Sequence, residues 1–244
     1  MSERNPIAVA VAQLPMADTL AANLASARIA VAQAAGLGAD LVVLPECATT
    51  GFHRGLRELC EPGALDDAVL TLQSDVNQHG VVAVVGTPLF DGPLVRNAAI
   101  TLRPGRAPVV AHKVGLTASE AGFFTPGERG APWVVGDWRF GVILCREILD
   151  KADVLRDFQG AIDVLLWPGY ISWDQPGGAG EDYLAVAKEL ARTLGVHLLQ
   201  CNWPHAINDP SLRGMGGSVW LDPAGVLIRR APADVPSMTL LTLR

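Results

Sequence analysis

Three residues that could act together in hydrolysis, Glu46, Lys113 and Cys145, each follow a short stretch of mainly apolar residues. Such stretches are typical of buried strands, and ligand sites in α/β proteins border the carboxyl ends of strands. A thiolate can attack a carbonyl or nitrile carbon, a carboxylate can accept the thiol proton, and an ammonium group can stabilise the resulting oxyanion. The three residues therefore predict a cysteine hydrolase site assembled from three strand ends.

Each of these residues also has an ordinary structural explanation. A free cysteine is more often a small buried hydrophobe than a nucleophile, and a lone glutamate or lysine after a strand commonly lies at the surface. Their joint placement favours chemistry over these explanations. The other cysteines, Cys47, Cys60 and Cys201, are expected to be reduced structural thiols, because their spacing fits neither a disulfide scaffold nor a zinc site.

The elements that would position these residues are indicated by apolar periodicity and turn residues. Four helices are predicted, over residues 19–35, 66–79, 148–159 and 181–194. Twelve strands are predicted, over residues 7–13, 41–45, 81–87, 96–102, 108–112, 133–135, 139–145, 162–167, 196–202, 217–221, 226–230 and 238–243. Turn residues at 103–105, 136–137 and 222–225 predict three hairpins.

Hairpins alternate with helical crossovers in this order of elements. Strands joined through helices can be parallel, whereas hairpin strands are antiparallel, so mixed sheets are expected. The pattern predicts an α/β fold in which two mixed sheets pack face to face with helices outside, a four-layer αββα sandwich. The 244 residues, half of them hydrophobic, suffice for one such domain over residues 1–244.

Charge and composition restrict the partners. The formal net charge of −6, the pI near 5.3 and the lack of a basic cluster argue against nucleic acid or an anionic membrane surface and favour a small-molecule substrate. No signal peptide pattern and no apolar stretch of membrane-spanning length is present, which predicts a cytoplasmic protein.

Three segments resemble, in order, the signature blocks of the nitrilase (carbon–nitrogen hydrolase) superfamily. They are Leu-Pro-Glu at 44–46 with Thr-Gly-Phe at 50–52, His-Lys at 112–113 with Leu116, and Gly-Val-Ile-Leu-Cys at 141–145. Further similar segments follow the same order and extend the resemblance over nearly the whole chain, at 124–127, 160–161, 191–193, 217–218 and 222–225. Several ordered blocks are far more specific than any single motif.

The resemblance implies an αββα sandwich that commonly assembles as a homodimer or a higher homo-oligomer, and a reaction that needs no cofactor or metal. It implies that Cys145 is the nucleophile, that Glu46 is the general base and that Lys113 stabilises the oxyanion. Glu120 occupies the place of a second glutamate that orients the substrate nitrogen and supports Lys113. The backbone N–H of Arg146 would be a second oxyanion donor.

Substrate contacts are less clearly indicated. Most relatives follow the cysteine with an aromatic residue and an acid, whereas this chain has Arg146 and Glu147. Arg146 could bind a substrate carboxylate or pair with a nearby acid, and Glu147 could cap the next helix. The remaining candidate contacts to the acyl group are Phe52, Tyr170, Trp173 and Asn202, although large aromatic residues equally often pack in the core or in a dimer contact.

The leading functional prediction is a cysteine-dependent hydrolase that converts a small linear amide to a carboxylate and ammonia. A nitrile or an N-carbamoyl compound is the alternative substrate within the same superfamily. A metal-dependent phosphoesterase on a similar four-layer fold is an alternative from another class, for which His205, Asn202, Asp209 and Asp222 are conceivable ligands. A non-catalytic binding protein is a third possibility.

Overall fold

The computed structural model describes residues 4–174 and 183–244, and two six-stranded sheets form its centre. The first sheet contains, in spatial order, β12 (Ser237–Leu243), β1 (Ile7–Gln13), β2 (Leu41–Val43), β3 (Val82–Asp91), β4 (Leu94–Arg103) and β5 (Arg106–His112). Its strands β1, β2 and β3 are parallel, while β12, β4 and β5 pair antiparallel with their neighbours. Helices α1 (Leu20–Gly36) and α2 (Pro62–His79) supply the parallel crossovers.

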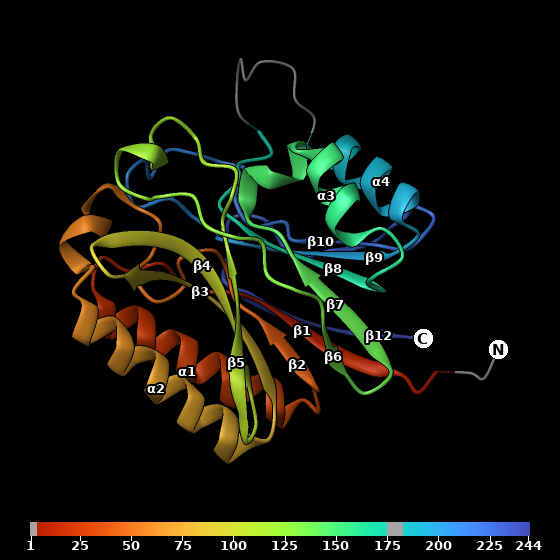
Figure 1. Cartoon of the computed structure of the whole chain (residues 1–244), viewed down its shortest axis with the longest axis horizontal. Coiled ribbons are helices and arrows are strands. Elements are labelled where there is room, and N and C mark those ends of the chain that lie inside the picture. Colours follow the sequence, from red (N-terminus) through yellow and green to blue (C-terminus); the bar gives the residue numbers. More distant parts are fainter. Residues whose placement is uncertain (1–3, 175–182) are drawn as a thin grey trace.

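The second sheet has the same mixed character. In spatial order it contains β11 (Leu227–Arg230), β10 (Val219–Leu221), β9 (His197–Asn202), β8 (Val164–Gly169), β7 (Trp138–Val142) and β6 (Trp133–Val135). Its strands β7, β8 and β9 are parallel and are joined through α3 (Lys151–Phe158) and α4 (Tyr183–Leu194). Figure 1 shows α1 and α2 outside the first sheet and α3 and α4 outside the second, which confirms the predicted four layers.

The alternation of side chains along β1 shows how the layers are held together. Ile7, Val9 and Val11 belong to the apolar core between the two sheets, whereas Ala10 and Ala12 belong to the core under the outer helices. Successive side chains of a strand point to opposite faces, so a central strand with both faces buried must be apolar throughout. Small alanines on the outer face let the helices pack closely on the sheet.

The largest difference from the predicted elements occurs at Cys145. The strand predicted over residues 139–145 ends at Val142, and the helix predicted from residue 148 is divided into a 3₁₀ helix, η3 (Cys145–Leu149), and α3. Cys145 has a φ angle of 49°, and a residue in this left-handed region cannot continue a strand. The cysteine therefore lies in a sharp turn beyond the strand.

Other differences concern two short helices and one hairpin. Two further 3₁₀ helices, η1 (Arg54–Leu59) and η2 (Glu120–Gly122), lie in segments with no predicted helix. The hairpin of β3 and β4, which turns at Gly92 with a φ angle of 57°, was also not predicted. The first two residues of the helix predicted over 181–194 lie outside the described residues. Within the described ranges, no helix has both the length and the apolarity to cross a bilayer.

Candidate active site

Glu46 lies in a tight segment directly after β2, and its side chain is fully buried. The backbone carbonyl of Glu46 accepts a hydrogen bond of 2.7 Å from Trp203 Nε1, which ties the segment to the chain beyond β9. On the other side, a Cβ atom at Gly86 of β3 would lie 2.7 Å from Glu46 Cα and 2.3 Å from the carbonyl oxygen of Pro45. Only glycine permits β3 to approach this closely.

Lys113 directly follows β5, and its buried ammonium group lies between two carboxylates. Its Nζ atom donates to Glu46 Oε1 at 2.7 Å and to Glu120 Oε1 at 2.5 Å. Glu120 begins η2, and its Oε2 atom accepts the Thr117 backbone N–H at 2.8 Å. Asn97 of β4 donates from Nδ2 to Glu46 Oε1 at 2.8 Å. The structure thus brings three of the four predicted catalytic residues into direct contact, and adds Asn97.

Cys145 is held in its turn by contacts at both the backbone and the thiol. Its carbonyl oxygen accepts a hydrogen bond of 2.6 Å from Trp167 Nε1, and its Sγ atom lies 3.7 Å from the carbonyl oxygen of Tyr170. The left-handed backbone of a non-glycine residue costs about 1–2 kcal/mol, so the surrounding contacts must outweigh this strain. The thiol is therefore positioned by β8 and the residues that follow it.

The electrostatics of this cluster follow from burial and from the alternation of charges. Burial raises the pKa of Glu46, and the effect outweighs the opposing attraction of Lys113. Burial and, to a smaller extent, the Glu46 carboxylate raise the pKa of Cys145 to about 12, although Lys113 opposes the shift. Burial alone would lower the pKa of Lys113, but Glu46, Cys145 and Glu120 raise it well above its usual value. Lys113 stays charged, while the thiol of the resting site stays protonated.

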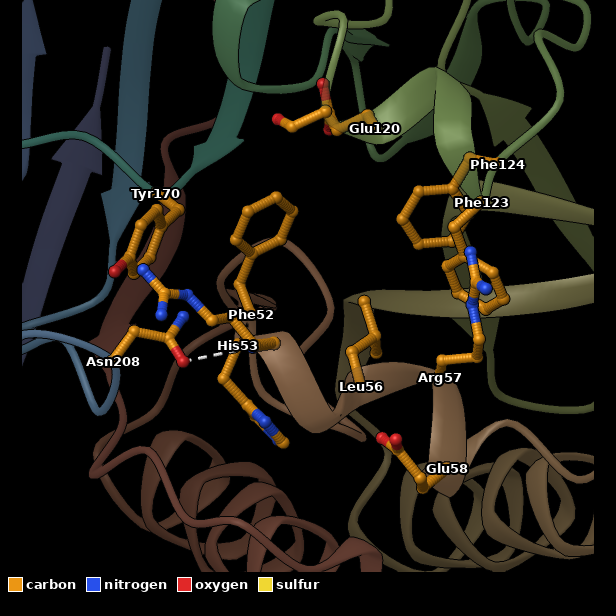
Figure 2. Close-up of a pocket in the computed structure, with 12 residues that line it drawn as sticks. Phe52, His53, Leu56, Arg57, Glu58, Glu120, Phe123, Phe124, Tyr170 and Asn208 are labelled. Atoms are coloured by element: carbon orange, nitrogen blue, oxygen red, sulfur yellow. Dashed lines mark hydrogen bonds between the residues drawn. The ribbon is translucent and has the colours of Figure 1, made fainter.

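A cavity of about 530 Å³ opens beside this cluster. Its wall includes the side chains of Glu120, Phe52, Tyr170, Leu56 and Phe124. Figure 2 shows Phe52 between Tyr170 on one side and the phenylalanines of the η2 segment on the other, with Glu120 at one edge. The rings of Phe52 and Tyr170 stack with their centroids 5.0 Å apart. Phe52, Tyr170 and Glu120 are the predicted site residues that line the cavity.

The other three predicted substrate contacts have partners elsewhere. Arg146 forms an ion pair with Asp150 through two nitrogen–oxygen distances of 3.2 Å. Trp173 Nε1 donates to the Gly216 carbonyl oxygen. The buried side chain of Asn202 is bonded to the backbone of Ile171 through both its oxygen and its nitrogen, so its role is to join two segments.

Glu147 has a structural role that the sequence indicated only in part. Its Oε2 atom accepts the Leu144 N–H at 2.7 Å, which agrees with the expected cap. Its Oε1 atom also accepts the N–H groups of Val114 at 2.8 Å and Gly115 at 3.3 Å, and Arg129 lies 3.4 Å away. One buried carboxylate therefore links the segment after Lys113 to the segment before Cys145.

The residues considered as metal ligands each form hydrogen bonds with other partners. His205 Nε2 lies 3.2 Å from the backbone of Met16, Asp209 accepts hydrogen bonds from Ser211, and Asp222 accepts backbone N–H groups of its own turn. Within residues 4–174 and 183–244, no group of three or more histidine, cysteine, aspartate or glutamate residues is arranged to hold a metal ion.

Solved structures of nitrilase-superfamily proteins share this architecture. A mutant of the Nesterenkonia AN1 amidase, of the nitrilase superfamily, superposes with a TM-score of 0.83 at 20% identity over 97% of this chain and 90% of that chain. This chain therefore has the α/β fold of nitrilase-superfamily proteins, with two mixed sheets between layers of helices. Sequence comparison gives the family: this chain belongs to the carbon–nitrogen hydrolases, whose family model matches residues 8–240.

Two curated relatives are similar to this chain in sequence. A nitrilase of Pyrococcus abyssi is 30% identical over 128 residues, which cover 50% of this chain and 49% of that protein. The matched part of this chain thus spans about half the length of that relative. The omega-amidase NIT2 of Danio rerio is 27% identical over 73% of this chain and 72% of that protein. This member of the carbon–nitrogen hydrolase family therefore has amidases among its relatives and structural neighbours.

Proposed function

We propose that this protein hydrolyses a small linear amide to a carboxylate and ammonia through a thioester on Cys145. The observation that carries the proposal is the difference in hydrogen bonding between the two oxygens of the Glu46 carboxylate. Its Oε1 atom is bonded to Lys113 and Asn97, whereas its buried Oε2 atom has no hydrogen-bond partner among the described residues. One oxygen is thereby held in place and the other is free to accept a proton.

The first half of the reaction forms the acyl-enzyme. Glu46 takes the proton of the Cys145 thiol as the sulfur attacks the amide carbon, because a thiol whose pKa is about 12 is not ionised beforehand at neutral pH. The carbonyl oxygen becomes an oxyanion that the Lys113 ammonium and the Arg146 backbone N–H stabilise. When the carbon–nitrogen bond breaks, Glu46 returns the proton to the nitrogen and ammonia leaves.

The second half releases the product. Glu46, again ionised, takes a proton from a water molecule that attacks the thioester carbon, and Lys113 stabilises the second oxyanion. Collapse of this intermediate breaks the carbon–sulfur bond, and the sulfur regains the proton from Glu46. The product leaves as a carboxylic acid, which loses its proton to water to give the carboxylate. Throughout the reaction, the hydrogen bond from Lys113 to Glu120 keeps the ammonium group in place. Glu120 also lines the cavity, where it can accept a hydrogen bond from the amide nitrogen.

The choice of an amide is supported by the cavity and by the relatives. The stacked rings of Phe52 and Tyr170 offer an apolar surface suited to a short acyl chain. The Nesterenkonia amidase has been solved in complex with butyramide and with acrylamide, and the Danio rerio relative is an omega-amidase. A nitrile or N-carbamoyl substrate would use the same cysteine and is the alternative within the family.

Ammonia release from butyramide, butyronitrile and N-carbamoyl-β-alanine tests the proposal. We expect butyramide to be the best of the three and Cys145→Ala to abolish its hydrolysis, while EDTA leaves the rate unchanged. Cys60→Ala is the matched control, because it removes a half-buried thiol that lies outside the ion-paired cluster. Turnover of butyramide by Cys145→Ala at the wild-type rate would exclude the mechanism.

An acid-quenched sample observed by intact-protein mass spectrometry tests the intermediate directly. We expect a butyryl adduct on Cys145 in the wild type and none in Cys145→Ala. Hydrolysis of a phosphodiester to a phosphomonoester and an alcohol, if it required a divalent ion and survived Cys145→Ala, would instead favour a metal-dependent phosphoesterase.

A further inference from the structure

The cavity has a second chemical feature, a set of hydrogen-bond donors on the wall near Tyr170. Arg54 of η1 and Asn208 both line the cavity, and the Arg54 backbone N–H donates to Asn208 Oδ1 at 3.0 Å. Because the amide oxygen of Asn208 is occupied by this bond, its Nδ2 group remains as a donor. Figure 2 shows Tyr170 and Asn208 next to each other on one side of the cavity, away from Phe123 and Arg57.

The two arginines of η1 that line the cavity differ in their partners. Arg57 donates to the Gly122 carbonyl oxygen at 2.7 Å and lies over the Phe123 ring, with 5.0 Å between its guanidinium carbon and the ring centroid. Arg57 thus supports the η2 segment. The Arg54 guanidinium forms no hydrogen bond or ion pair with any residue in the described part of the chain. Its five N–H donors are available to a ligand.

No carboxylate in the described part of the chain forms an ion pair with the Arg54 guanidinium. Glu120 is bonded to Lys113, and Asp209 accepts hydrogen bonds from the backbone and hydroxyl of Ser211. Glu58 also lines the cavity, with its Oε2 atom 3.5 Å from the position that a Cβ atom would take at Gly55. The wall at Arg54 therefore carries a positive charge without a bound partner.

We propose that the substrate is a short amide with a carboxylate at its far end, and that Arg54 binds this carboxylate. The proposal rests on the amide hydrolysis proposed above and adds the chemistry of the distal group. The amide would lie at Glu120 and Cys145, the methylene chain would cross the stacked rings of Phe52 and Tyr170, and the carboxylate would reach Arg54. A guanidinium binds a carboxylate through two parallel hydrogen bonds, which a neutral chain end cannot form.

Three amides that differ only at the far end test this proposal. Succinamate, butyramide and 4-aminobutanamide carry a negative, a neutral and a positive end on similar chains. We expect the wild-type kcat/KM to fall in that order. Arg54→Gln should lower kcat/KM for succinamate about 10-fold to 100-fold, mainly through KM, because the lost contact is remote from the reacting atoms. Arg54→Glu should invert the preference toward 4-aminobutanamide.

The controls separate the specificity from the activity. Arg54→Gln should lower kcat/KM more for succinamate than for butyramide, and a Tm within about 2 °C of wild type should report correct folding. Arg106→Gln, at an exposed arginine of β5, should leave all three substrates unchanged. Equal kcat/KM for succinamate and butyramide in the wild type, with both reactions dependent on Cys145, would overturn the role of Arg54 and leave amide hydrolysis standing. Absence of any Cys145-dependent hydrolysis of the three amides would overturn the proposed function itself.

Discussion

Replacement of Glu147 by glutamine should damage both stability and catalysis, although Glu147 is not among the proposed catalytic residues. Only 1% of its surface is exposed, and its two oxygens accept backbone N–H groups from the segments before Cys145 and after Lys113. Glutamine keeps the shape but has one acceptor oxygen, so it can serve only one of the two segments. Its NH₂ group then faces backbone donors of the other segment, which lose their partner.

The magnitude follows from the number of bonds lost. A hydrogen bond to a charged group contributes about 1.5–3 kcal/mol, and a buried donor left unpaired costs about 1–3 kcal/mol. Relief from burying the Glu147 charge offsets part of this loss. We therefore expect Glu147→Gln to lower the free energy of unfolding by about 3 kcal/mol and Tm by roughly 6–12 °C at this chain length.

Catalysis should suffer because Glu147 keeps the Lys113 and Cys145 segments at a constant separation. A displacement of about 1 Å between catalytic groups can lower the rate about 100-fold, so we expect kcat for butyramide to fall about 10-fold to 100-fold. KM should change little, because the cavity wall is untouched. Urea unfolding followed by tryptophan fluorescence gives the stability, and steady-state ammonia release gives kcat.

The matched control is Glu189→Gln, which removes a carboxylate that is 51% exposed and pairs with Lys151 at the surface. It should change the free energy of unfolding by less than about 0.5 kcal/mol and leave kcat unchanged. If Glu147→Gln behaves like this control in both measurements, the link between the two segments is not needed and the reasoning fails.

Three further predictions concern Gly86, Glu46 and Asp163. Gly86→Ala should lower kcat at least 10-fold and reduce Tm, as measured by ammonia release and thermal unfolding, because its Cβ atom would overlap the backbone of Pro45 and displace Glu46. The pKa of Glu46 is raised by burial, and Glu46 must be ionised to act as a base, so kcat/KM should decline on the acid side around a pKa above the ordinary value of about 4.3. An acid limb at or below that value would contradict the assignment. Hydrogen bonds from Arg139 lower the pKa of Asp163 to about 2 despite its partial burial, so this group stabilises the fold above about pH 4 and loses that contribution as the pH falls toward 2. Asp163→Asn should therefore flatten the decline in urea stability between these pH values, and an unchanged decline would exclude a contribution from Asp163.

The sequence predicted the layers because the signal for each layer is local. Alternating apolar residues such as Val9 and Val11 require a strand with a buried face, and glycine and proline mark the turns between strands. The ordered blocks around Glu46, Lys113 and Cys145 identified the family, and the family match over residues 8–240 confirmed it. These features survive in a single sequence because each depends on a few neighbouring residues.

Other parts of the site could not be predicted because they depend on register between distant segments. Asn97 contacts Glu46 across 51 positions of the chain, and a lone asparagine within a strand carries no pattern that indicates such a partner. The turn at Cys145 is set by Trp167 and by residues after β8, so an apolar stretch alone suggested that the strand continued to the cysteine. Both features are tertiary, and both bear directly on the reactive groups.

The departure from the family pattern at Arg146 and Glu147 suggested that substrate preference is encoded beside the cysteine. The contacts favour another division of roles. Arg146 forms an ion pair with Asp150, and the Glu147 carboxylate accepts hydrogen bonds from backbone N–H groups. Both side chains therefore stabilise the turn that presents Cys145. Arg54 of η1, by contrast, borders the cavity, and its guanidinium has no partner among the described residues. If Arg54 selects the distal group, the reactive groups are held by buried ion pairs at strand ends, while specificity lies on a short surface helix that can change without disturbing them.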